Sequence, residues 1–273
     1  MRGTFRLANI LGINIDIHFT FFLLIMFFAL VMGIKGIALI IGVFFFVTLH
    51  ELCHSIAAAH FGIKVKQITL LPIGGVASMS ELPSKPYQEL LISLAGPASN
   101  IIIVLIFYYP LILMLGKETL MYPFMVITGQ AKYTGDFNIF AHIYWINLIL
   151  AVFNMIPAFP MDGGRALRAL LTYRMGYKKA TEAAVRLGHI FALVFAYIGI
   201  AHGHIFLLII AVFIYMSAST EGLQVDVTET IKNYTIRDIL ANNYMSVDPD
   251  TPLSKVLELM LHVHQEDFPV IEE

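Results

Sequence analysis

The sequence is poor in charge and almost free of cysteine. Asp, Glu, Lys and Arg make up 13% of its 273 residues, about half the share of a soluble globular protein. The formal net charge of −2 gives no indication of a nucleic-acid partner. The single cysteine, Cys53, excludes an intramolecular disulfide. The N-terminal apolar run has no clear small-residue cleavage site, so we interpret it as a retained first span rather than a signal peptide.

The chain is instead rich in long apolar segments. Hydrophobic residues make up 58% of it, and the mean hydropathy is +0.78. A spanning helix needs about 20 mostly apolar residues. The sequence therefore predicts an all-α polytopic membrane protein with six transmembrane helices, at about Ile17–Ile34, Gly36–His60, Glu89–Leu115, Phe137–Ile156, Arg186–Ala201 and His204–Ser219.

The basic residues predict how these helices are oriented. With a cytoplasmic N-terminus, only three basic residues fall on the outer side, namely Lys35, Lys117 and Lys132. Those on the cytoplasmic side are Arg2, Arg6, Lys64, Lys66, Lys85, Arg165, Arg168, Arg174, Lys178, Lys179 and Arg186. This excess matches the positive-inside rule. We expect a multi-pass protein of the cell membrane whose N- and C-termini are both cytoplasmic.

The composition changes near residue 221. Residues 222–273 are more polar and too few to bury a full core of their own. We therefore expect a membrane core over residues 1–221 and a short soluble cytoplasmic tail over residues 222–273.

A metal-binding pattern lies within the second predicted span. Residues 50–54 read His-Glu-Leu-Cys-His, and histidines at i and i+4 share one helix face, one turn apart. Such a pair can bind one metal ion, and the glutamate between them can reach a metal-bound water. Ionisable groups at membrane depth are costly unless they are paired or hydrated. We therefore favour a metal site over two buried histidines satisfied by their neighbours.

A catalytic zinc site needs a third protein ligand. Asp16, His18 and His60 are candidates, but Asp162 is the best of them. It lies in the segment Asn154–Arg165, where a regular helix is implausible because of two prolines and two glycines, Pro157, Pro160, Gly163 and Gly164. Non-helical backbone at membrane depth must be buried or line a wet cavity. The fourth span is thus expected to unwind and turn Asp162 towards the metal; the alternative is a solvated turn at the interface.

These motifs resemble those of the site-2 proteases, which are intramembrane zinc metalloproteases, over about residues 5–220. The resemblance rests on His50-Glu-x-x-His54, on Asn154 to Gly163, on Leu71-Pro-Ile-Gly-Gly-Val76 and on Gly96-Pro-Ala-Ser-Asn100. It implies that His50, His54 and Asp162 bind one Zn²⁺ and that Glu51 is the general base and acid. It also implies a partly re-entrant β-segment near residues 65–80 and a substrate that is itself a membrane helix in the lipid bilayer.

The tail resembles the first half of a cystathionine-β-synthase (CBS) domain, and it places the chain near the sporulation-type group of the family. The matching residues are Thr235–Leu240, Met245–Asp250 and Phe268–Val270. A full nucleotide-binding unit usually needs a pair of such modules, so this segment is expected to be truncated. A nucleotide partner at a complete CBS region follows from the resemblance alone.

Three further residues have more than one interpretation. Asn100 either supports the metal site from behind or lies in a closely packed helix interface with Gly96. Asn154 either hydrogen-bonds the substrate or a developing oxyanion, or bonds a neighbouring helix. Cys53 stands where the family usually has glycine; its thiol either competes for the metal or, as we favour, simply packs.

The function expected is therefore cleavage of transmembrane segments by water that a zinc ion activates. Two other classes compete with it. A divalent metal or proton transporter also places His and Asp inside a membrane, but no inverted repeat is visible in the hydropathy. An inactive scaffold that binds membrane helices would not require the intact set of ligands.

Overall fold

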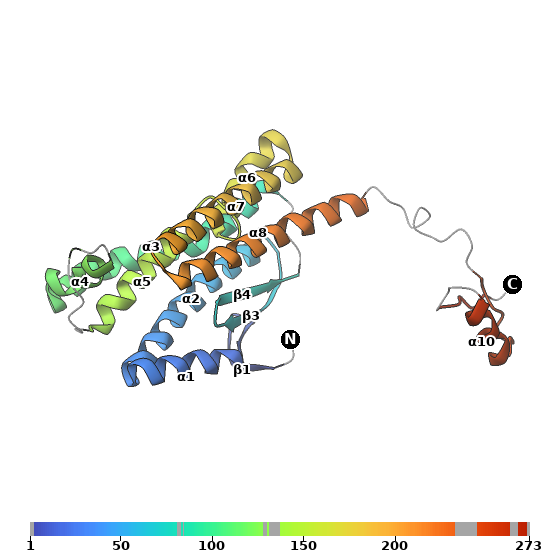
Figure 1. Cartoon of the computed structure of the whole chain (residues 1–273), viewed down its shortest axis with the longest axis horizontal. Helices are drawn as coiled ribbons and strands as arrows, with labels where there is room; N and C mark the ends of the chain where they lie inside the picture. Colours follow the sequence, from blue (N-terminus) through green and yellow to red (C-terminus); the bar gives the residue numbers. More distant parts are fainter. Residues whose placement is uncertain are drawn as a thin grey trace. The chain divides into compact units, whose positions relative to one another are not determined.

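The computed structural model describes residues 3–80, 83, 85–127, 130, 137–232, 245–262 and 267–271. The chain divides into two compact units, Met1–Val225 and Asp226–Glu273. The helices of the first unit are α1 (Thr20–Met32), α2 (Ile34–His60), α3 (Pro86–Leu115), α4 (Lys117–Ile127), α5 (Ile139–Asn154), α6 (Asp162–Met175), α7 (Tyr177–Ala201) and α8 (Ile205–Lys232), the last of which continues into the second unit. Helices α2, α3 and α5 pack against one another, α6 packs on α3 and α7, and the long helices run in similar directions (Figure 1).

Four of these helices are long and apolar enough to cross a membrane. They are α2, α3, α7 and the Ile205–Val225 part of α8. The helices α1 and α5 coincide with the other two predicted spans but have only 13 and 16 residues. The prediction of a membrane protein made mostly of helices is confirmed, and the count of six spans stays a prediction.

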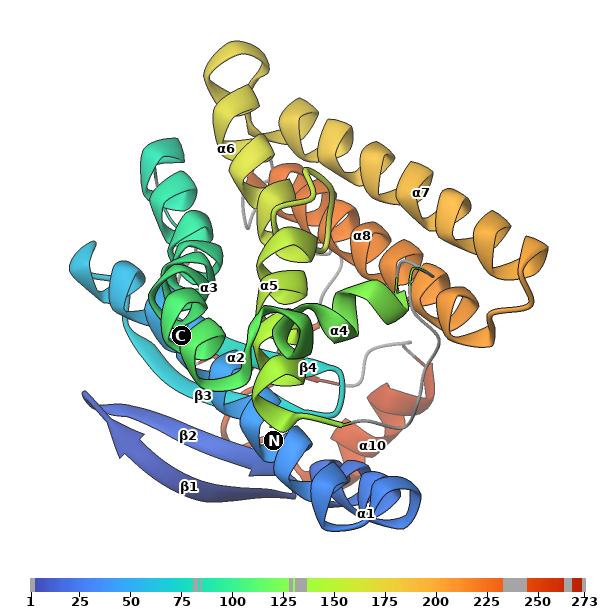
Figure 2. The same cartoon turned by 90° about the vertical axis from the view of Figure 1, so that its left-hand side faces the viewer.

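The expectation of an all-α fold is wrong in one respect, because a four-stranded sheet lies beside α1 and α2. Its strands are β1 (Thr4–Ile10), β2 (Ile13–His18), β3 (Val65–Leu71) and β4 (Gly74–Met79), in the order β1-β2-β3-β4 (Figure 2). Strands β2 and β3 are parallel and the other pairs are antiparallel. The predicted β-segment near residues 65–80 is thus present as the β3–β4 hairpin.

Of the residues in β1 and β2, the sequence analysis assigned only Ile17 and His18 to an element, at the start of the first predicted span. In β2, however, isoleucines 13, 15 and 17 alternate with Asn14, Asp16 and His18, and this period of two is typical of a half-buried strand. The apolar face of the sheet, with Ile15 and Ile68, packs on Phe21 of α1 and Phe44 of α2. This core positions β4 next to the middle of α2.

The predicted break after the fourth span is present. Helix α5 ends at Asn154 and α6 begins at Asp162. The expectation that Gly163 and Gly164 prevent a regular helix is wrong, because both lie in the first turn of α6. A Cβ atom at Gly163 would lie 2.5 Å from the carbonyl oxygen of Met155, and one at Gly164 would lie 2.5 Å from the carbonyl carbon of Ala158. The glycines therefore allow α6 to begin directly against the non-helical segment.

The described part of the second unit contains α10 (Leu253–His262) and a parallel bridge between Val247 and Val270. These two valines belong to two of the three CBS-like stretches. The third stretch, residues 235–240, lies outside the described residues. The CBS assignment and the division at residue 221 stay predictions.

Candidate metal centre

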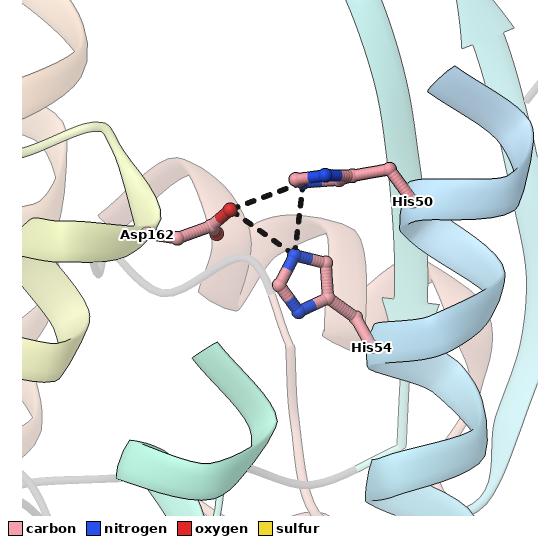
Figure 3. A group of neighbouring side chains, drawn as sticks. All are labelled: His50, His54 and Asp162. Atoms are coloured by element: carbon pink, nitrogen blue, oxygen red, sulfur yellow. Dashed lines mark hydrogen bonds and ion pairs between the residues drawn. The ribbon is translucent and has the colours of Figure 1, made fainter. Parts of the chain in front are cut away.

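Helix α2 presents its two motif histidines to the interior of the first unit. His50 and His54 are 4% and 5% exposed, and their Nε2 atoms lie 3.1 Å apart. One helical turn separates the two residues, so both rings project from the same face of α2. Figure 3 shows the two imidazoles turned towards the start of α6.

Asp162 completes the group from a distant part of the chain. It is the first residue of α6, and its Oδ2 atom lies 3.1 Å from Nε2 of both His50 and His54 (Figure 3). Of the described His, Cys, Asp and Glu residues, these three form the group with ligand atoms close enough to share one ion. Asp162 is therefore placed to bind a metal, and the alternative of a solvated turn is wrong. The rival candidates Asp16, His18 and His60 are not part of this group.

Helix α3 supports both histidines through their other ring nitrogens. Nδ1 of His54 lies 2.6 Å from the carbonyl oxygen of Ile92, and Nδ1 of His50 lies 3.1 Å from Oδ1 of Asn100. When each Nδ1–H donates to its oxygen, each Nε2 keeps its lone pair for a metal. Asn100 thus supports the site from behind, and it does so from a fully buried position in the helix interface.

Gly96 allows α3 to come this close to α2. A Cβ atom at this position would lie 2.7 Å from Nε2 of His50 and even closer to Nε2 of His54. The glycine is therefore required by the close approach of the two helices. Its position on α3, one turn from Ile92 and one from Asn100, places it between the two oxygens that orient the rings.

The sequence analysis missed Asn147 on α5. Its Nδ2 atom donates to the backbone oxygen of Asn100 at 3.1 Å, and the residue is 3% exposed. This bond ties α5 to the part of α3 that supports His50. An isolated asparagine in an apolar helix was the available signal, since polar groups within membrane helices commonly bond a neighbouring helix.

Glu51 lies beside the sheet. A Cβ atom at Gly75 of β4 would come within 2.6 Å of Cγ of Glu51, so the two segments are in close contact. The side chain of Asn154, the last residue of α5, makes no hydrogen bond within the described part of the chain. Cys53 is partly exposed and lines a surface cavity together with Ile56, Ala57, His60, Phe61 and Leu91. None of the three ligands lines this cavity, which supports a packing role for the thiol.

The three ligand side chains, His50, His54 and Asp162, fit one zinc ion. Two imidazoles and one carboxylate are the protein ligands of a common class of catalytic zinc site, which leaves a fourth position for water or substrate. A His-Glu-x-x-His helix provides two ligands and a candidate base from a single turn. Combined with apolar helices long enough to span a membrane, this site defines a membrane metalloprotease.

Comparison with known proteins agrees with that class. Residues 38–196 match the profile of Peptidase family M50, which is more than half of the chain, so the chain belongs to this family. A zinc metalloprotease of Methanocaldococcus jannaschii is 35% identical over 284 residues, covering 100% of this chain and 76% of that protein. The solved structure of a site-2 protease from the same organism is 35% identical with a TM-score of 0.57, covering 80% of this chain and 95% of that one.

A relative named for sporulation is also similar. Stage IV sporulation protein FB of Bacillus subtilis is 26% identical over 135 residues, covering 49% of this chain and 40% of that protein. The family and these relatives establish the resemblance drawn from the motifs. The protein is a zinc metalloendopeptidase of the membrane, with His50, His54 and Asp162 placed to hold the ion.

Proposed function

We propose that the protein cleaves transmembrane segments of membrane-protein substrates within the bilayer. The observation that carries this proposal is the meeting of three ligand atoms midway along a spanning helix. His50 follows Ile34, the first residue of α2, by about 24 Å of helix, and the hydrocarbon core is about 30 Å thick. A metal held there lies below the lipid headgroups.

His50, His54 and Asp162 hold the ion in this proposal, and Glu51 moves the proton. Bound zinc supplies Lewis acidity, which acidifies water and polarises a peptide carbonyl. Glu51 takes a proton from the attacking water and passes it to the leaving amine. The adjacent position of Glu51 on the same helix as both histidines supports this role.

The substrate reaches the site as an extended strand. A helix shields its carbonyls in hydrogen bonds, so it must unwind before it is cut. Strand β4 pairs with β3 along one side and lies at the edge of the sheet order, and its Gly75 is in contact with Glu51. An unwound segment that pairs with β4 by β-augmentation would pass close to the proposed base. We infer that the β3–β4 hairpin is re-entrant for this purpose.

The remaining predictions are part of the same proposal. The core crosses the cell membrane six times, with α1 and α5 as the two shorter spans, and both termini are cytoplasmic. Residues 222–273 form a CBS-like cytoplasmic tail, and a nucleotide binds only where a complete pair of CBS modules is present. Asn154 remains a candidate contact for the substrate backbone.

The test compares the wild type with Glu51→Gln after reconstitution in liposomes. Loss of the general base should reduce cleavage of a model membrane substrate by about 100-fold or more, while zinc content stays the same because all three ligands remain. Glu182→Gln is the control, since Glu182 forms an exposed pair with Arg186 on α7. Metal transport without a cut product would instead support a transporter. Binding of the substrate helix with neither transport nor cleavage would support a scaffold.

A further inference from the structure

Helix α6 carries a buried charged residue, Arg168, six residues after the partly buried Asp162. Arg168 is 3% exposed, and its Nε atom donates to Oε1 of Glu89 on α3 at 2.7 Å. Its Nη2 atom contacts the same oxygen, and Glu89 is itself 6% exposed. The sequence analysis counted Arg168 among the charges that orient the protein in the membrane. The structure buries it inside the helical core instead.

Two aromatic rings fix the position of this guanidinium. Its central carbon lies 4.8 Å from the ring centroid of Phe159 and 4.8 Å from that of Tyr177. Phe159 is fully buried in the non-helical segment before Asp162, and Tyr177 is the first residue of α7. A guanidinium held by aromatic rings and by a carboxylate has little freedom to rotate or shift.

A third helix joins the same cluster. Oε2 of Glu221 on α8 lies 3.6 Å from Nη1 of Arg168, and its Oε1 atom lies 3.2 Å from Nη2 of Arg165. Two arginines and two glutamates thus balance each other across α3, α6 and α8. We call these four residues, Glu89, Arg165, Arg168 and Glu221, the ion-pair cluster.

The cluster connects the two halves of the metal centre. Glu89 stands on α3, the helix that orients His54 through Ile92 and His50 through Asn100. Arg168 stands on α6, the helix that begins with Asp162. The pair of Glu89 and Arg168 therefore constrains the separation between the helix that orients the imidazoles and the helix that supplies the carboxylate.

We propose that Glu89, Arg168 and Glu221 are positioning residues that hold Asp162 at the distance from His50 and His54 that one metal ion requires. Glu221 makes this distance depend on α8, because a displacement of α8 removes a carboxylate from both arginines. This inference rests on the metal centre of the proposed function. It concerns metal binding, so it is tested without measuring cleavage.

The physical reason for an ion pair at this place is geometry rather than net stability. A buried ion pair is often no more stabilising than apolar residues of similar volume. An arginine fork nevertheless defines both a distance and an orientation, which apolar packing does less sharply. Metal ligands need to be held to within about 0.5 Å. A directional contact between α3 and α6 meets this requirement better than loose apolar packing does.

The main test replaces the pair by apolar residues in Glu89→Leu/Arg168→Met. The double variant removes both charges of the Glu89–Arg168 pair, and Glu221 keeps Arg165 as a partner. The full-length variant should therefore fold with a nearly unchanged metal-free melting temperature. We expect the dissociation constants of Zn²⁺ and Co²⁺ to rise about 10- to 100-fold, and the visible absorption of bound Co²⁺ to change because its ligand geometry changes. The control is Glu182→Gln/Arg186→Gln, which removes an exposed pair on α7.

Two further variants separate geometry from charge. Arg168→Lys keeps the charge but loses the fork, so it should also weaken metal binding; full binding in this variant would contradict a geometric role. Glu221→Gln should weaken binding several-fold, and an unchanged constant would overturn the link to α8. Unchanged affinity and an unchanged Co²⁺ spectrum in the double variant would overturn the proposal as a whole. A wild type that binds no metal would instead contradict the proposed function itself.

Discussion

Two neighbouring elements approach helix α2, and each does so at a glycine. The two glycines face different residues of the His-Glu-x-x-His motif. Gly96 of α3 lies against the two histidines, and Gly75 of β4 lies against Glu51. On the α3 side, oxygens of Ile92 and Asn100 also hold the rings in place. On the β4 side, the contact is a close approach of carbon atoms to the glutamate side chain.

In the proposed mechanism, this difference separates metal binding from proton transfer by Glu51. Ligands have to be rigid, because a metal site tolerates little misplacement. A general base has to reach first the attacking water and then the leaving group. Its side chain therefore needs more freedom to move than a metal ligand does, and the β4 side leaves Glu51 that freedom. Substitutions on the α3 side should therefore change metal affinity, and substitutions on the β4 side should change cleavage with the metal retained.

The largest effect is expected for Gly96→Ala. The new methyl group would overlap both imidazoles, so the rings must turn away and metal affinity should fall by more than about 100-fold, the upper range for residues behind the ligands. Isothermal titration with Zn²⁺ measures this. Gly42→Ala is the matched control on α2, because its methyl group would meet only the flexible end of Ile143. Equal affinities in the two variants would contradict the steric role of Gly96.

Asn100→Leu should have the next largest effect. It removes the acceptor for Nδ1 of His50, so the ring loses its preferred tautomer and the metal dissociation constant should rise roughly tenfold. Asn100→Asp keeps an oxygen at this position and should bind metal more tightly than the leucine variant. If leucine and wild type bind equally well, Asn100 only packs between the helices.

Gly75→Ala should leave metal affinity unchanged and still reduce cleavage, by about tenfold. Its methyl group would displace Cγ of Glu51, and proton transfer depends on a hydrogen-bond distance to the attacking water. Zinc content and the rate of substrate cleavage are measured on the same preparation. Ser78→Ala on the same strand is the control. Loss of zinc in the Gly75 variant would show that the two sides of α2 are not separable.

The smallest effect is expected for Cys53→Gly. Cys53 lines a surface cavity away from the group of three ligands, so zinc content should not change and cleavage should stay within a few-fold of the wild type. Glycine within a helix costs roughly 1 kcal/mol relative to alanine, which a modest drop in melting temperature would report. A large gain in cleavage would show that the thiol blocks the metal.

Much of the candidate site could be predicted from the sequence because its information is local. The spacing of His50 and His54 determines a shared helix face, and the prolines before Asp162 determine a break in the chain. Long apolar runs likewise predict spanning helices with little dependence on the rest of the protein. The family motifs then assigned Asp162, a residue more than 100 positions away, to the same ion.

Other features depended on contacts between distant segments. The last two residues of β2, Ile17 and His18, read as the start of an apolar span until β2 pairs with β3, some 50 residues later. The two glycines after Asp162 read as helix breakers until their close approach to Met155 and Ala158 is known. Arg168 reads as a surface charge until Glu89 is placed next to it.

The sequence by itself determined the class of the protein, its apolar helices and the two histidines on one helix face, because helical periodicity and short motifs act over a few residues. The tertiary structure then decided that Asp162 meets both histidines. Only the tertiary structure decided that Gly96 and Gly75 flank α2, that Asn147 supports Asn100, and that Arg168 is buried against Glu89. Each of these is a contact between side chains or backbones far apart in the chain, and its distance is set by how whole helices and strands pack.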